Sequence, residues 1–205
     1  MVVTVWTDYI CPWCYLGLDR TRYLRDLGVD TTVLPYELHP EIPEGGLPAK
    51  SSYRRLAGEY EAAGLPFRPP PRVVNSHFAL CASETVRRLQ PESFDAVHES
   101  LFAAYFAEGR DIGDRGTVLS IVEAAGVDVT VVLDAFENGS APDWLRQSMD
   151  AARAAEVAGT PAWQFPNGLL VPGAQPREFL GRVVRRLSPG DEDVSPTSCP
   201  ADDRG

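Results

Sequence analysis

The stretch Asp8-Tyr9-Ile10-Cys11-Pro12-Trp13-Cys14-Tyr15-Leu16-Gly17 lies near the start of a chain of 205 residues. Before it, the apolar alternation from Val2 to Thr7 predicts a β-strand. After it, apolar residues at helical spacing continue to Gly28, and proline is well tolerated in a first helical turn, so a helix is expected to start at the cysteine pair. Unpaired N–H groups and the helix dipole favour a thiolate there. The pattern predicts a redox-active pair.

Two regions of different pattern follow. Residues 31–38 predict a second strand, and a connector rich in proline and glycine comes next, at residues 40–48. Beyond it, apolar residues recur at three- and four-residue spacing, which predicts helices at 51–63, 76–89, 91–107, 114–125, 129–137 and 142–157. Residues 162–165 and 169–171 predict a hairpin, and residues 176–187 predict a closing helix.

This order of elements predicts the domain organisation. A discontinuous α/β domain is expected at residues 1–46 and 158–188, interrupted by a helical insertion domain at residues 47–157. Residues 189–205 are too polar and too rich in proline to build a core, so a disordered acidic tail is expected there. The hydrophobic content of 44% is enough for one sizeable core.

Charge and hydropathy exclude several classes of partner. The net charge is −10, and the acidic tail holds a large part of it. Nucleic acids and anionic membranes require clustered positive charge, so neither is expected as a partner. No run of residues approaches the length of a membrane span, and the chain passes from Met1 directly into a predicted strand, so a cytoplasmic protein is expected.

Four cysteines are present, and two of them are spaced for chemistry. Cys11 and Cys14 form the close pair, whereas Cys81 and Cys199 are more than a hundred residues apart. A zinc site would need a second close pair, so no metal is expected. Cys81 is expected to pack as a small hydrophobic residue, and Cys199 to be exposed in the tail and available for thiol adducts.

The predicted order β-α-β, helical insertion, α-β-β-α is that of a thioredoxin fold with a large all-helical insertion. On these residues the chain resembles the DsbA-like thioredoxin-fold oxidoreductases, and within them the cytosolic FrnE-type branch. The pattern from Asp8 to Gly17, the segment Pro35–Pro40, Asn75 with His77, and Val157–Pro161 carry the resemblance. It departs at Ser76 and Ala79-Leu80, and at Gly159-Thr160-Pro161, where the family usually has Gly-Val-Pro.

The resemblance implies a cis-proline at Pro161 that faces the redox pair. In that geometry the hydroxyl of Thr160 is expected near the sulfur atoms, where it would donate to a thiolate and tune the redox potential. Pro12 and Trp13, together with Thr160 and Pro161, are expected to form the substrate groove.

Exchange chemistry assigns roles to the two cysteines. Cys11, at the helix start, is expected to be the nucleophile, and Cys14, one turn later, to resolve the mixed disulfide. Glu37 is a candidate proton relay for Cys14, although strand alternation is equally consistent with an outward side chain. His39 and His77 are expected to be hydrogen-bonded scaffold residues.

These observations predict a thiol–disulfide oxidoreductase that acts on protein or small-thiol disulfides, and they leave its direction open. No tightly bound cofactor is expected, although mycothiol or glutathione is a candidate co-substrate. One alternative is a reductase or transferase of small electrophiles that depends on such a thiol. Kappa-class glutathione transferases and hydroxychromene-carboxylate isomerases share the layout but usually have serine in place of Cys11. The other alternative is a non-catalytic peptide-binding module.

Overall fold

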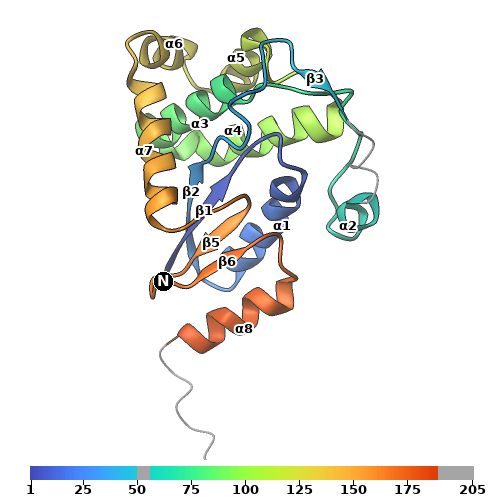
Figure 1. Cartoon of the computed structure of the whole chain (residues 1–205), viewed down its shortest axis with the longest axis vertical. Coiled ribbons are helices and arrows are strands. Elements are labelled where there is room, and N and C mark those ends of the chain that lie inside the picture. The colour runs from blue at the N-terminus through green and yellow to red at the C-terminus, as the bar shows by residue number, and fades with distance from the viewer. Residues whose placement is uncertain (50–55, 189–205) are drawn as a thin grey trace, which may run out of the picture.

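A four-stranded mixed sheet forms the centre of the molecule in the computed structural model, which describes residues 1–49 and 56–188 (Figure 1). The strands run in the order β2-β1-β5-β6, with bounds Asp30–Pro35, Val2–Thr7, Ala162–Gln164 and Leu170–Pro172. β1 is parallel to β2 and antiparallel to β5, and β5 is antiparallel to β6. The parallel pair requires a crossover, which helix α1 (Pro12–Asp26) provides.

Helix α1 starts as the sequence predicts. Cys11 is its N-cap residue, Pro12 is its first residue, and Leu27 and Gly28 end it. Gly28 has a φ of 76°, a conformation that glycine adopts without steric cost. The closing helix α8 (Arg177–Leu187) packs against α1. The predicted hairpin is formed by β5 and β6.

In Figure 1, helices α3 to α6 gather above the sheet, α7 runs down beside β2, and α2 lies beside α1. Their bounds are Ala57–Ala62 for α2, His77–Leu89 for α3, Pro91–Ala103 for α4, Arg115–Ala124 for α5, Val129–Glu137 for α6 and Ser140–Ala154 for α7. The side chains of Asp114 and Asp128 cap α5 and α6 by accepting hydrogen bonds from the backbone N–H groups of Thr117 and Thr130.

The structure adds features that the periodicity of the sequence does not predict. The two-residue strands β3 (Leu47–Pro48) and β4 (Arg72–Val73) pair with each other, and the helix predicted at 91–107 is α4 followed by a π-helical turn, η2 (Ala104–Glu108). The second strand is shorter than predicted, because the N–H groups of Glu37 and Leu38 bond to side chains instead of a neighbouring strand. The predicted tail and the start of the first predicted insertion helix lie outside the described residues.

A single cluster of buried side chains joins the sheet to the insertion. It includes Val3 and Val33 from the sheet, Leu16 from α1, and Leu101 and Phe106 from α4 and η2. In the described part of the chain, no helix is long and apolar enough to cross a membrane.

Candidate active site

Cys11 lies at the start of α1, where the chain leaves β1. Its residue is 3% exposed, and its Sγ lies 3.3 Å from the carbonyl oxygen of Thr160. Its own carbonyl accepts hydrogen bonds from the N–H groups of Cys14 and Tyr15, which close the first turn of the helix. The hydrogen bond from the Cys14 thiol is the largest influence that lowers the pKa of Cys11, and it outweighs the effect of burial. The arrangement favours a thiolate at Cys11.

Cys14 follows one turn later and is 2% exposed. Burial raises its pKa well above that of an ordinary thiol, and the neighbouring Cys11 sulfur raises it further. Both cysteines are free thiols in this structure. Because the pKa of Cys11 is lowered and that of Cys14 is raised, the Cys11 sulfur holds the negative charge and the Cys14 sulfur keeps the proton.

The loop before β5 faces this pair. The Thr160–Pro161 peptide bond is cis, as the family resemblance implies. The Thr160 hydroxyl is buried, has no nitrogen or oxygen partner among the described residues, and lowers the pKa of both thiols. Gly17 of α1 lies behind the loop, where an added Cβ would be 3.6 Å from the Pro161 side chain. The predicted hydroxyl near the sulfurs is thus in place.

Pro12 and Trp13, between the two cysteines, have different surroundings. We call residues 11–14 the redox loop. Its Trp13 side chain is 42% exposed, so the loop presents a large apolar group to solvent. The carbonyl of Pro12 accepts a hydrogen bond of 2.8 Å from the hydroxyl of Tyr60 in α2. Their role in substrate binding stays a prediction.

Asp8 is a buried carboxyl group to which the sequence analysis assigned no role. Its Oδ1 accepts a hydrogen bond from the N–H of Ile10, its Oδ2 accepts one from the N–H of Leu38, and its own carbonyl accepts the N–H of Cys11. Burial raises the pKa of Asp8 to about 6, against hydrogen bonds that include the Ser76 hydroxyl. Its negative charge raises the pKa of Cys11. An aspartate among apolar residues, three positions before the first cysteine, was the available signal.

Glu37 points toward helix α3. Its Oε1 lies 2.9 Å from Nδ1 of His77, and this bond raises the pKa of the histidine. The Nε2 of the same ring lies 3.7 Å from Sγ of Cys81, whose pKa burial raises to about 12. Glu37 also raises the pKa of Asp8 by charge. The relay assigned to Glu37 stays a prediction, with Asp8 between it and the cysteine pair.

The other candidates lie away from the pair. His39 is exposed, and its Nδ1 is 2.9 Å from the carboxylate of Glu41. Cys199 lies outside the described residues. Within residues 1–49 and 56–188, no group of three or more histidine, cysteine or acidic side chains is arranged to hold a metal ion.

Comparison with known proteins places this geometry in a family. The model of the DSBA-like thioredoxin domain matches residues 2–185. YwbO of Bacillus subtilis (strain 168) is 22% identical over 197 residues, which cover 89% of this chain and 94% of YwbO.

Solved structures agree with the fold. A probable DsbA oxidoreductase of Streptomyces coelicolor has a TM-score of 0.80 at 23% identity, over 91% of this chain and 89% of its own. The cytosolic disulfide reductase DsbM of Pseudomonas aeruginosa, also solved with GSH, has a TM-score of 0.65 at 20% identity, over 91% of this chain and 100% of its own. The predicted fold is confirmed, and the chain belongs to the DSBA-like thioredoxin domain family.

Proposed function

We propose that this chain is a thiol–disulfide oxidoreductase in which Cys11 is the nucleophile and Cys14 the resolving thiol. One observation carries the proposal: two free, adjacent thiols have oppositely shifted pKa values at a helix N-terminus that faces the cis-proline loop. Two cysteines that served only as core packing would not require a lowered pKa at one thiol and a raised pKa at the other. The family supports the same chemistry.

The exchange takes place in two displacements. The Cys11 thiolate attacks one sulfur of a partner disulfide, so that a mixed disulfide forms and the other partner sulfur leaves as a thiolate. Cys14 then loses its proton and attacks the Cys11 sulfur, which forms the Cys11–Cys14 disulfide and releases the second partner thiolate. Two electrons pass from the pair to the partner. The same steps in reverse oxidise a partner dithiol.

Asp8 is the proposed acceptor of the Cys14 proton. A thiol with a raised pKa needs a base beside it, and Asp8 lies near enough to Cys14 for its backbone to lower the pKa of that thiol. The Asp8 carboxyl, with a pKa of about 6, is suited to accept and release a proton near neutral pH. From Asp8, the proton would pass by way of Glu37 to the half-exposed His77, and from there to solvent.

The substrates are proposed to be protein or small-molecule disulfides, with glutathione or mycothiol as the thiol that restores the pair. DsbM, solved with GSH, shares the fold, and its description as cytosolic supports a cytoplasmic setting for this chain. The same likeness supports the second candidate, a reductase of small electrophiles that uses such a thiol. The two differ in whether Cys14 is needed, because adduct chemistry at Cys11 alone does not require a resolving thiol.

Insulin reduction in the presence of a thiol reductant tests the proposal. The wild-type chain is expected to accelerate the reaction, Cys11→Ser to abolish the acceleration, and Cys14→Ser to stop at a mixed disulfide that mass spectrometry detects. Cys81→Ala is the matched control, because that thiol is buried with a raised pKa and should leave the rate unchanged. Full activity in Cys11→Ser would overturn the proposal. Peptide binding by an inactive wild type would favour a binding module.

A further inference from the structure

Residues 56–71, which we call the α2 segment, contain helix α2 and end next to Ala49. At its base, the N–H of Ala49 donates to the carbonyl of Pro71, next to the paired strands β3 and β4. In Figure 1, α2 lies beside α1 and apart from helices α3 to α7. The α2 segment therefore lies next to the start of α1, where the redox pair is found.

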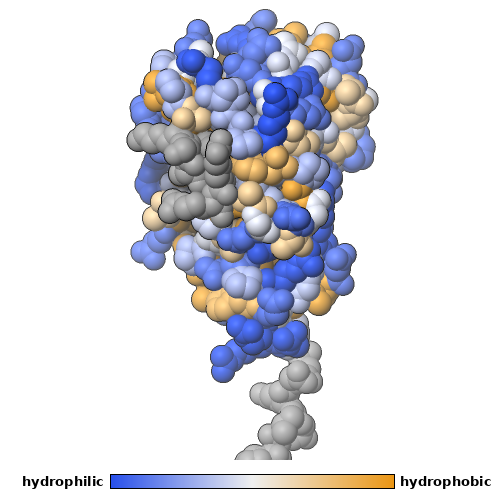
Figure 2. Space-filling model, turned by 90° about the vertical axis from the view of Figure 1, so that its right-hand side faces the viewer, coloured by the Kyte–Doolittle hydropathy of each residue, from blue (hydrophilic) through white to orange (hydrophobic). Residues whose placement is uncertain are grey.

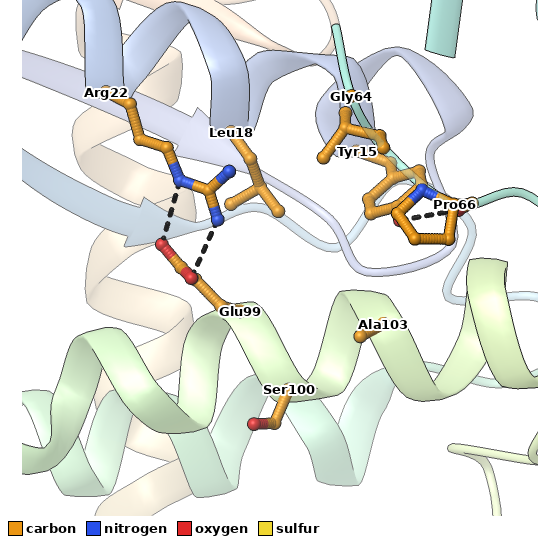
Figure 3. A pocket seen from close by; sticks show the side chains of 9 residues that line it. Tyr15, Leu18, Arg22, Gly64, Pro66, Glu99, Ser100 and Ala103 are labelled. Carbon is orange, nitrogen blue, oxygen red and sulfur yellow. Dashed lines mark hydrogen bonds and ion pairs between the residues drawn. The ribbon is translucent and has the colours of Figure 1, made fainter. Parts of the chain in front are cut away.

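Two tyrosine hydroxyls fasten this segment to the redox loop and to α1. Tyr60 is fully buried, and its hydroxyl donates to the carbonyl of Pro12, the residue after the nucleophile. The hydroxyl of Tyr15 donates to the carbonyl of Pro66 at 2.7 Å, as Figure 3 shows. The Tyr60 ring also contacts the Tyr15 ring, with centroids 5.3 Å apart.

Apolar packing also holds the segment, because Leu56, Tyr60 and Leu65 belong to the buried cluster. The N–H of Arg68 adds a backbone hydrogen bond to the carbonyl of Phe106. A pocket of about 330 Å³ separates residues 64–66 from helix α4, bounded at one end by the Arg22–Glu99 ion pair (Figure 3). The two tyrosine hydrogen bonds therefore act together with this apolar packing to hold the segment in place.

The attachment bears on access to Cys11. Cys11 and Tyr60 belong to one buried cluster, and Cys11 is almost completely covered while its neighbour Trp13 remains exposed. Figure 2 shows the face on which α2 lies, where several hydrophobic residues gather near the middle of the molecule. A partner that approaches Cys11 on the Pro12 side therefore meets the α2 segment.

We propose that the α2 segment, held on the Pro12 carbonyl by Tyr60, is a specificity element that favours low-molecular-weight disulfides over protein disulfides at Cys11. The inference rests on the proposed function and names its substrate class. A small disulfide needs only local side-chain movement to reach the covered sulfur of Cys11, with the segment in place. A protein disulfide must also lay its flanking chain across the redox loop, and this requires the segment to move aside.

Tyr60→Phe tests the inference, because it removes the hydroxyl and keeps the ring. Rates are measured with glutathione disulfide and with insulin, for wild type and variant. The insulin rate is expected to rise about fivefold, the factor by which losing one ordinary intramolecular hydrogen bond shifts an opening equilibrium. The glutathione disulfide rate is expected to stay within about twofold, since that reaction does not wait for the opening.

Tyr105→Phe is the matched control. Its hydroxyl also donates to a backbone carbonyl, that of Arg72, but outside the α2 segment. Both rates are expected to remain those of the wild type. An unchanged insulin rate in Tyr60→Phe, or an equal rise with both substrates, would overturn the inference and leave the proposed function standing. A wild type that reduces neither substrate would overturn both.

Alkylation gives a second readout that does not depend on turnover. In a background with Cys81→Ala and Cys199→Ser, Cys11 is treated with iodoacetamide or with a maleimide that carries a long polyethylene glycol chain. Tyr60→Phe should accelerate the bulky reagent and not the small one. Equal acceleration of both reagents would indicate a changed thiol pKa instead of changed access, and would contradict the inference.

Discussion

Asp8 and His98 are buried side chains whose pKa values shift in opposite directions. Burial raises the pKa of Asp8 to about 6 and lowers that of His98 to about 4. Above pH 4, the folded chain keeps a proton on Asp8 that the unfolded chain has released, so Asp8 makes the free energy of unfolding fall as the pH rises toward 6. His98 does the reverse, because between pH 4 and 6.5 only the unfolded chain protonates it.

Replacing either residue should leave the effect of the other one visible in the pH dependence of the free energy of unfolding. In Asp8→Asn, the free energy of unfolding relative to wild type is expected to increase by about 2.5 kcal/mol between pH 4 and 7, whatever the constant cost of the lost carboxylate acceptor. In His98→Gln, the same difference should decrease by about 3 kcal/mol over that range. Urea unfolding at a series of pH values measures both. Curves that stay parallel to the wild type would refute the assignment.

Local pattern was enough to predict the cysteine pair and the helix that starts there, because each depends on neighbouring residues. The cis-proline loop at Thr160-Pro161 was expected from the family resemblance. The role of Asp8 was not predictable in this way. Its burial and its hydrogen bonds depend on Leu38 and Ser76, which the fold brings from distant positions. The same applies to Tyr60, whose contact with Pro12 joins residues 48 positions apart in the chain.

At the scale of elements, the sequence predicted most of the helices and the four strands of the central sheet, but it did not predict the short strands β3 and β4. Strands β3 and β4 have two residues each, so they are too short to carry an alternation that could be detected. The turn η2 continues the apolar pattern of α4, and a change from α to π spacing leaves that pattern almost unaltered. Element ends were less predictable than element types because long-range hydrogen bonds decide them.

Gly17 lies at the contact between α1 and the cis-proline loop. An alanine Cβ there would meet Pro161 and Trp163 at ordinary van der Waals distances of 3.6 to 3.8 Å. Gly17→Ala is therefore expected to stabilise the chain by about 0.5–1 kcal/mol, since glycine is costly inside a helix. Gly17→Leu has no room and should destabilise it by about 1–3 kcal/mol while lowering insulin reduction. Thermal unfolding and the insulin assay check the pair, and a destabilised Gly17→Ala would contradict the predicted spacing.

At the scale of the whole molecule, the predicted domains share one core. The hydroxyl of Tyr9 lies 2.9 Å from Nδ1 of His98, and its ring packs on Phe102 of helix α4. On the opposite side of the insertion, the hydroxyl of Ser148 in α7 donates to the carbonyl of Pro35 in β2. The boundaries at residues 46/47 and 157/158 therefore remain predictions about sequence pattern, and the packing favours a single cooperative unit.

Unfolding of a Trp144→Phe variant tests this cooperativity. Its remaining tryptophans, Trp6, Trp13 and Trp163, all lie in the predicted α/β domain, whereas most of the far-UV dichroism comes from helices of the insertion. The two signals are expected to share one urea midpoint, because separating the parts would expose the buried aromatic contact around Phe102. Phe102→Ala should shift both midpoints together, at a cost of about 3–5 kcal/mol. A helix signal that is lost before the fluorescence changes would show that the insertion unfolds on its own.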